Sequence, residues 1–180
     1  MALIEVDFDP ADVITVGVVG EPGNRTFFLE ARQGHSTCTL ILEKAQLQEL
    51  GAQILSILEP EEGHSGFAPD PITNPESPPG WRVGSIQLAL NAPGGDCTLL
   101  LEEMPTLHLG DDDEEAEAEP EEDVGNLRAA RLVATVRQIR RLGESALRAV
   151  SGGRPICPIC HFPIDPEGHV CPASNGHHPV

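Results

Sequence analysis

Short apolar or alternating segments dominate the first 42 residues. The β-branched run 13–19 predicts a strand, and residues 3–8 predict a shorter strand that opens the sheet. Segments 26–32 and 36–42 predict a hairpin that turns around residues 33 and 34. Alternation within this hairpin places two sets on different faces, namely Phe27, Leu29 and Ala31 on one and Cys38, Leu40 and Leu42 on another.

A helical period follows these strands. Between residues 43 and 58, four apolar residues recur at intervals of three and four, namely Leu47, Leu50, Ile54 and Leu58. This spacing is typical of an amphipathic helix, although Gly51 weakens it slightly. Residues 59–80 are rich in proline and acidic side chains, which predicts a loop.

The second half follows a similar plan. Residues 81–90 and 97–102 predict two strands joined by a turn, and residues 127–133 predict one more. Thr135 and Gln138 have the spacing of a capping box, which predicts that a helix begins after Thr135. Gly152-Gly153 predicts the end of this helix. Its apolar face is formed by Val136, Ile139, Leu142, Ala146, Leu147 and Val150.

These patterns together predict an α+β fold with an antiparallel sheet and two amphipathic helices packed on it. Strands followed by a helix occur twice, which suggests a strand-strand-helix duplication, although the residues of the two halves show no convincing identity. We expect a globular domain over residues 1–150, with a proline-rich loop at 59–80 and an acidic disordered loop at 104–124. Residues 151–180 form a separate tail that contains a zinc knuckle.

The tail carries the clearest chemistry in the chain. Cys157 and Cys160 form a CxxC turn, which lets two thiolates reach one tetrahedral ion. After a turn at residues 166–168, His169 and Cys171 lie two apart on an extended segment, so both side chains can point inward. The predicted metal ligands are therefore Cys157, Cys160, His169 and Cys171, and the predicted cofactor is zinc.

Other interpretations of these residues stay open. His161, His177 and His178 compete with His169 as the fourth ligand, since zinc accepts either ring nitrogen of a histidine. A redox CxxC usually begins a helix, and the nearby prolines disfavour that interpretation here. Cys38 and Cys97 lie within apolar strand patterns, which predicts a role in core packing.

Charge is distributed unevenly along the chain, whose formal net charge is −18. Residues 111–123 hold ten acidic and no basic side chains, whereas residues 124–180 hold seven Arg and three acidic residues. The overall acidity argues against a generic nucleic-acid binder and against an acidic membrane surface as partner. We find no signal peptide and no transmembrane span, so we expect a cytoplasmic protein with reduced thiols.

Several exact segments resemble an actinobacterial family known as domain of unknown function 3090. These are Phe8-Asp9-Pro10, residues 20–32, Leu42-Glu43-Lys44, residues 152–155, residues 165–172 and Asn175-Gly176. The resemblance implies an uncharacterised protein with no assigned activity. The family's tail has Gly at the position of His161, and Tyr and Arg at those of His177 and His178, which implies that His169 is the fourth ligand.

The leading hypothesis is a non-enzymatic binding or adaptor protein that has another protein as partner and a structural zinc site. One alternative is an enzyme with an unrecognised site, built with His35 or His64 and nearby acids. Another is a nucleotide or nucleic-acid binder that uses the last helix and the knuckle, through Arg137, Arg140, Arg141 and Arg148. No catalytic motif is recognisable, so whether the protein is an enzyme stays open.

Overall fold

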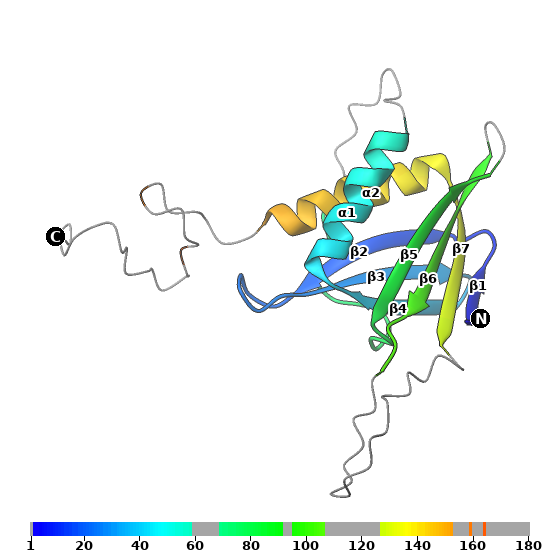
Figure 1. The fold of residues 1–180 in the computed structure, drawn as a ribbon, viewed down its shortest axis with the longest axis horizontal. Helices are drawn as coiled ribbons and strands as arrows, with labels where there is room; N and C mark the ends of the chain where they lie inside the picture. The colour runs from blue at the N-terminus through cyan, green and yellow to red at the C-terminus, as the bar shows by residue number, and fades with distance from the viewer. Residues whose placement is uncertain are drawn as a thin grey trace, which may run out of the picture.

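A computed structural model of the chain describes residues 2–58, 69–91, 95–106, 127–152, 159 and 164. Its elements are β1 (Leu3–Phe8), β2 (Val13–Val19), β3 (Thr26–Gln33), β4 (Ser36–Leu42), α1 (Lys44–Ile57), β5 (Val83–Leu90), β6 (Asp96–Glu103), β7 (Arg128–Thr135) and α2 (Val136–Ser151). The fold is α+β, as predicted, but the strands form two sheets instead of one (Figure 1). One has the order β1-β7-β6-β5 and the other the order β2-β3-β4.

The strand pairs are antiparallel except for β1, which runs parallel to β7. Glycines with positive φ form the two turns of the first hairpins: Gly20 and Gly23 between β2 and β3, and Gly34 between β3 and β4. The predicted separation of side chains between two faces was wrong. Leu29 is the cross-strand partner of Leu40, and directly opposed residues share one face of a sheet.

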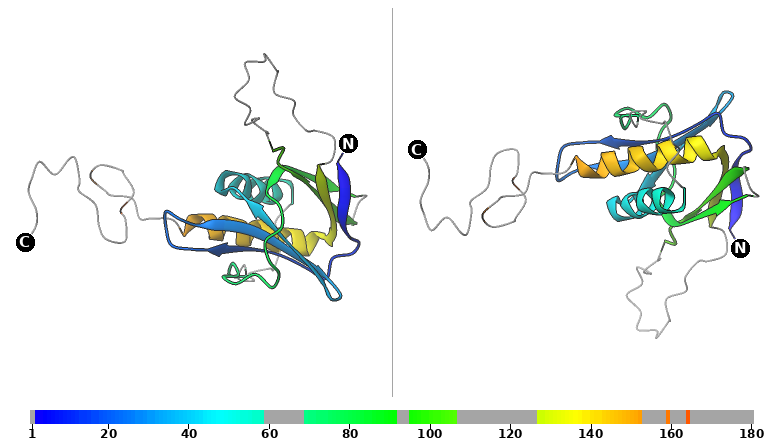
Figure 2. Two further views of the ribbon diagram at one scale, coloured as in Figure 1. Left: turned by 90° about the horizontal axis from the view of Figure 1, so that it is seen from below. Right: turned by 90° about the horizontal axis from the view of Figure 1, so that it is seen from above.

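α2 packs on β2 and also contacts β6 and β7, and α1 packs against α2 (Figure 2). The sheets approach each other at two places, where the backbone N–H of Ile41 donates to Trp81 O (3.1 Å) and that of Ala11 donates to Val133 O (2.7 Å). The core between sheets and helices is mostly aliphatic and has Phe8, Phe27 and Trp81 as aromatic members. Its least exposed members, at 0 or 1%, include Val16, Leu29, Leu40, Leu47, Ile54, Leu99, Leu132 and Ile139.

The two halves repeat one topology of three antiparallel strands followed by a helix. The repeats are β2-β3-β4-α1 and β5-β6-β7-α2. Both helices begin with a capping box whose third residue is glutamine, with Glu43 as N-cap in α1 and Thr135 in α2. The repeated unit therefore has three strands where the sequence suggested two.

A segment that we call the strap, residues 69–82, crosses the outer face of the sheet β2-β3-β4. At one edge Ile72 exchanges two backbone hydrogen bonds with β2, and at the other Gly80 N donates to Thr39 O of β4 (2.7 Å). The predicted loop 59–80 thus includes an ordered part. Its first ten residues, most of the predicted acidic loop 104–124 and nearly all of the tail 151–180 lie outside the described residues.

Neither α1 nor α2, the two helices of the described chain, is long and apolar enough to cross a membrane.

Candidate functional site

The four predicted zinc ligands lie outside the described residues, so the structure does not test them. Within the described part of the chain, no group of three or more His, Cys, Asp or Glu residues could hold a metal ion. Cys97 is buried and Cys38 is half-buried, in accord with their predicted place in the core. Desolvation by burial, with a contribution from Glu5, raises the pKa of Cys38 to about 11.

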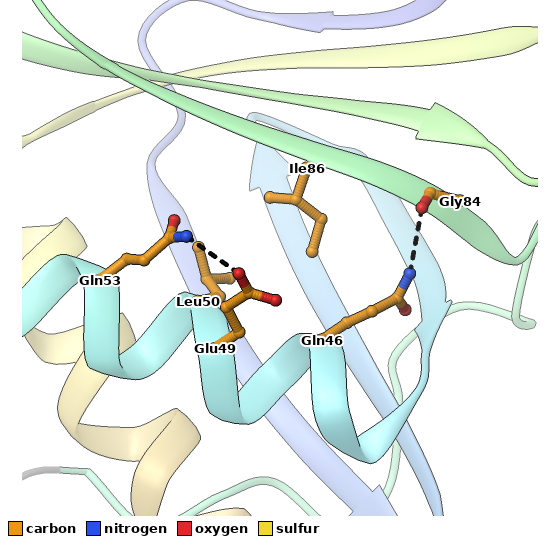
Figure 3. A pocket seen from close by; sticks show the side chains of 6 residues that line it. All are labelled: Gln46, Glu49, Leu50, Gln53, Gly84 and Ile86. Atoms are coloured by element: carbon orange, nitrogen blue, oxygen red, sulfur yellow. Dashed lines mark hydrogen bonds between the residues drawn. The ribbon is translucent and has the colours of Figure 1, made fainter.

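A cleft between α1 and β5 is the candidate binding site. It encloses about 140 Å³, and Figure 3 shows the residues that line it. Leu50 from α1 and Ile86 from β5 form its apolar floor, and in Figure 3 Ile86 points toward the helix. The remaining lining residues are Gln46, Glu49, Gln53 and Gly84.

The polar rim of the cleft is held in place by hydrogen bonds. Gln46 Nε2 donates to Val83 O (2.9 Å) and Gly84 O (3.3 Å), which fixes one end of α1 to the start of β5. At the other end Gln53 Nε2 donates to Glu49 Oε1 (3.2 Å), one helical turn away. The rim therefore presents a carboxylate and amide groups beside an apolar floor.

The opposite half of the fold has the same arrangement at α2 and β2. Gln138, at the position that corresponds to Gln46, donates through Nε2 to Ala11 O (3.1 Å) and Asp12 O (3.0 Å). The matching hydrogen bonds place Asp12 in register with Gly84. Ile14, Val16 and Val18 of β2 therefore correspond to Ile86, Leu88 and Leu90 of β5.

This correspondence makes the difference between the two halves informative. Ile14 is 8% exposed and Val16 is fully buried, because α2 packs closely on β2. Their counterparts Ile86 and Leu88 are only partly buried, and Leu90 is 50% exposed. α1 thus leaves part of the apolar surface of β5 uncovered, whereas α2 covers the corresponding surface of β2.

A difference in side-chain size at one helix position accompanies this difference in exposure. The tenth residue of α2 is Ser145, which is 1% exposed and small enough to let the helix approach β2. The tenth residue of α1 is Gln53, whose longer side chain lines the cleft and is hydrogen-bonded to Glu49 of the same helix. The helices differ at most other positions as well, so Gln53 against Ser145 is one of several side-chain differences that accompany the open cleft.

A second cavity, of about 230 Å³, lies between the strap and the outer face of the sheet β2-β3-β4. Glu30, 6% exposed, borders it and accepts hydrogen bonds from Thr39 Oγ1 (3.0 Å) and the Glu76 backbone N–H (2.7 Å). Thr39 is also hydrogen-bonded to Ser77 Oγ (2.8 Å). These contacts hold the strap on the sheet, so we assign Glu30 a structural role.

Comparison with known proteins identifies a family over residues 6–171, described as "Protein of unknown function (DUF3090)". The chain belongs to the DUF3090 family. No curated protein and no solved structure matches it. The DUF3090 match extends from β1 to the last predicted zinc ligand, Cys171, and so includes both the cleft and the whole predicted metal site.

The structure also locates the residues of the alternative hypotheses in this DUF3090 protein. His35 lies exposed in the turn between β3 and β4 and lines neither cavity, while His64 lies outside the described residues. Arg137 and Arg141 are exposed on α2. Arg148 forms an ion pair with Asp70 of the strap (2.7 Å), so this part of the basic face already binds an acid of the same chain.

Sequence reasoning missed the cleft. Gln138 was predicted only as a capping residue, and Gln46 was not singled out at all. A glutamine at the third position of both helices was the available signal, but its second role depends on which strand lies opposite the helix. Glu30 also carried a signal, because it is an acid between apolar residues of a strand, Leu29 and Ala31.

Proposed function

We propose that this protein is a non-enzymatic binding protein, an adaptor that holds a partner protein in the cleft between α1 and β5. One observation carries the proposal: Ile86 and Leu88 of β5 are only partly buried, whereas their counterparts Ile14 and Val16 of β2 are buried beneath a helix, and Leu90 beside them is 50% exposed. An uncovered apolar surface with a polar rim is typical of a protein interaction site.

Site-specific photo-crosslinking tests this proposal. A photoreactive amino acid replaces Glu49 at the cleft rim, and in a matched control it replaces Arg141, the residue at the same position of α2. Both side chains are exposed. We expect the Glu49 variant to form a discrete crosslinked product with another protein in cells, and the Arg141 variant to lack it. The same products from both variants, or none from either, would contradict the proposal.

We further propose that one zinc ion organises the tail through Cys157, Cys160, His169 and Cys171. Three thiolates and one imidazole match the donor set of a closed tetrahedral zinc site, which has no place for a substrate water. When bound, zinc would supply structural order, because its ligands must come together to bind it. Zinc binding also requires reduced thiols, which fits the cytoplasmic location expected from the sequence.

Metal content per chain, measured on protein purified without a metal-affinity tag, tests the zinc site. We expect about one zinc per chain, its loss in Cys171→Ser and weaker retention in His169→Ala. His177→Ala serves as the control and should retain the metal. Full zinc content in His169→Ala together with loss in His177→Ala would transfer the fourth ligand to His177, and metal-free wild-type protein would refute the site.

A further inference from the structure

The edge of β2 already binds an extended segment of the same chain. Val18 N donates to Ile72 O (2.9 Å), and Ile72 N donates to Val16 O (3.0 Å). The segment runs parallel to β2, with Ile72 opposite Gly17. The backbone groups of Val16 and Val18 that face away from β3 are satisfied by this added piece of strand.

At the corresponding edge of β5, backbone groups point away from the sheet at the positions that match Val16 and Val18 of β2. Asn91 N donates to Asp96 O (2.9 Å), so residues 91, 89 and 87 exchange hydrogen bonds with β6. The N–H and C=O groups of the intervening Leu88 and Leu90 must point away from β6. Among the described residues, β5 is the last strand of its sheet; β4 bridges to Arg82 just before β5, and no strand pairs with the edge at Leu88 and Leu90.

The exposed side chains beside this edge include an apolar one and an acidic one. Leu90 is 50% exposed, and Glu49 lies exposed on the rim of the adjoining cleft. The chain as a whole has a net charge of −18, which disfavours the approach of a second copy and favours a basic partner. The occupant that fits is an extended segment whose β-branched apolar residues would contact Leu90 and whose basic residues would pair with Glu49.

We propose that β5 binds an extended basic segment of a partner protein as an additional strand, in the way that β2 binds the segment around Ile72. The inference rests on the proposed function and specifies how the partner binds. Backbone hydrogen bonds to Leu88 and Leu90 supply affinity, and contacts with the cleft supply preference for apolar and basic side chains.

The probe is a nine-residue peptide of alternating Lys and Val, added to the full-length protein, with a Glu–Val peptide as its control. Hydrogen exchange measured by NMR reports the bound mode. The amides of Leu88 and Leu90 should exchange rapidly in the free protein and slowly with the Lys–Val peptide, whereas those of Gln87 and Ala89 should be slow in both. Protection of other residues, or binding of both peptides equally, would overturn the proposal.

Leu90→Pro tests the backbone contact directly. Proline removes an N–H that β6 does not use, so the sheet is retained. We expect affinity for the Lys–Val peptide to fall about tenfold, the loss of one hydrogen bond. Leu90→Ala, which keeps the N–H, should bind more tightly than Leu90→Pro. Equal binding by the two variants would overturn strand addition, and thermal unfolding verifies that both are folded.

Light scattering and crosslinking separate the remaining outcomes. A dimer whose Leu88 and Leu90 amides are protected without peptide would mean that a second copy occupies the edge, which overturns the proposal. If the partner crosslinked at residue 49 still binds Leu90→Pro as it binds wild type, the adaptor function stands and strand addition fails. If residue 49 crosslinks no partner at all, the adaptor function itself fails.

Discussion

Gln46 and Gln138 each connect a helix to the other half of the molecule. Each Oε1 accepts the backbone N–H of the helix N-cap residue, while each Nε2 reaches carbonyl groups at the start of a distant strand. One amide thus satisfies both a helix end and a sheet edge, and each hydrogen bond contributes about 1 kcal/mol. Alanine would therefore be costlier at these positions than at an ordinary surface glutamine.

Cys38 provides a prediction at this scale. Its pKa is about 11, against an ordinary 9.0, so the fraction of Cys38 present as thiolate at neutral pH is about 100-fold lower than for an ordinary cysteine. The thiolate is the reactive form. Burial and the neighbouring Asp96 also raise the pKa of Cys97. In a variant with Cys157, Cys160 and Cys171 replaced by Ser, alkylation of the two remaining thiols should be slow and should accelerate as pH rises toward 11.

The same variant in denaturant is the control, because unfolding restores ordinary thiols. Native alkylation as fast as that of the denatured chain would contradict the assigned burial.

At the scale of elements, the two helices meet at glycines. Gly51 and Gly143 are each the eighth residue of their helix. A Cβ at Gly143 would lie 2.7 Å from Ile54 Cγ2, and one at Gly51 would lie 2.9 Å from Leu147 Cγ. The glycine that weakens α1 as an isolated helix is therefore the residue that lets α1 and α2 approach each other.

Gly143→Ala should consequently destabilise the protein, although the same change stabilises an isolated helix by about 1 kcal/mol. The added methyl group must displace Ile54 in a packed core, which costs roughly 1–3 kcal/mol. Urea denaturation measures the change in free energy of unfolding. The exposed Ala52→Gly in α1 calibrates propensity alone and should cost about 1 kcal/mol. A Gly143→Ala variant more stable than wild type would show that the helices are not in close contact.

At the scale of the whole molecule, the acidic segment occupies the place of a tight turn. In the first repeat, β3 and β4 are joined by two residues, Gly34 and His35. In the second repeat, the corresponding strands β6 and β7 are joined through residues 104–127, which contain the acidic run. The repeat thus identifies this segment as an insertion at a hairpin whose strands are already paired by β6–β7 hydrogen bonds.

Deleting residues 107–126 should therefore leave the fold intact. The deletion leaves four residues between β6 and β7, a common length for a hairpin loop. Arg128 and Glu103, which form an ion pair at the base of the loop, would stay in place. We expect a melting temperature within a few degrees of the wild type and unchanged far-UV circular dichroism. Failure to fold would mean that the insertion contributes to the core.

Local pattern determined the secondary structure. The β-branched runs, the helical spacing and the capping box at Thr135 predicted the strands and both helices within a few residues, because backbone dihedrals and caps depend on near neighbours. The order of the predicted elements, strands followed by a helix twice over, also suggested the repeat. The zinc ligands stay a prediction, since they lie outside the described residues.

Only the tertiary structure decided which elements meet. The parallel pairing of β1 with β7, the shared face of Leu29 and Leu40, and the reach of Gln46 to Val83 all join residues that no local period relates. The open cleft coincides with a difference in side-chain size, Gln53 against Ser145, which becomes meaningful only when the two halves are compared. Sequence by itself therefore specified the elements, while long-range packing specified the surface on which we expect the protein to act.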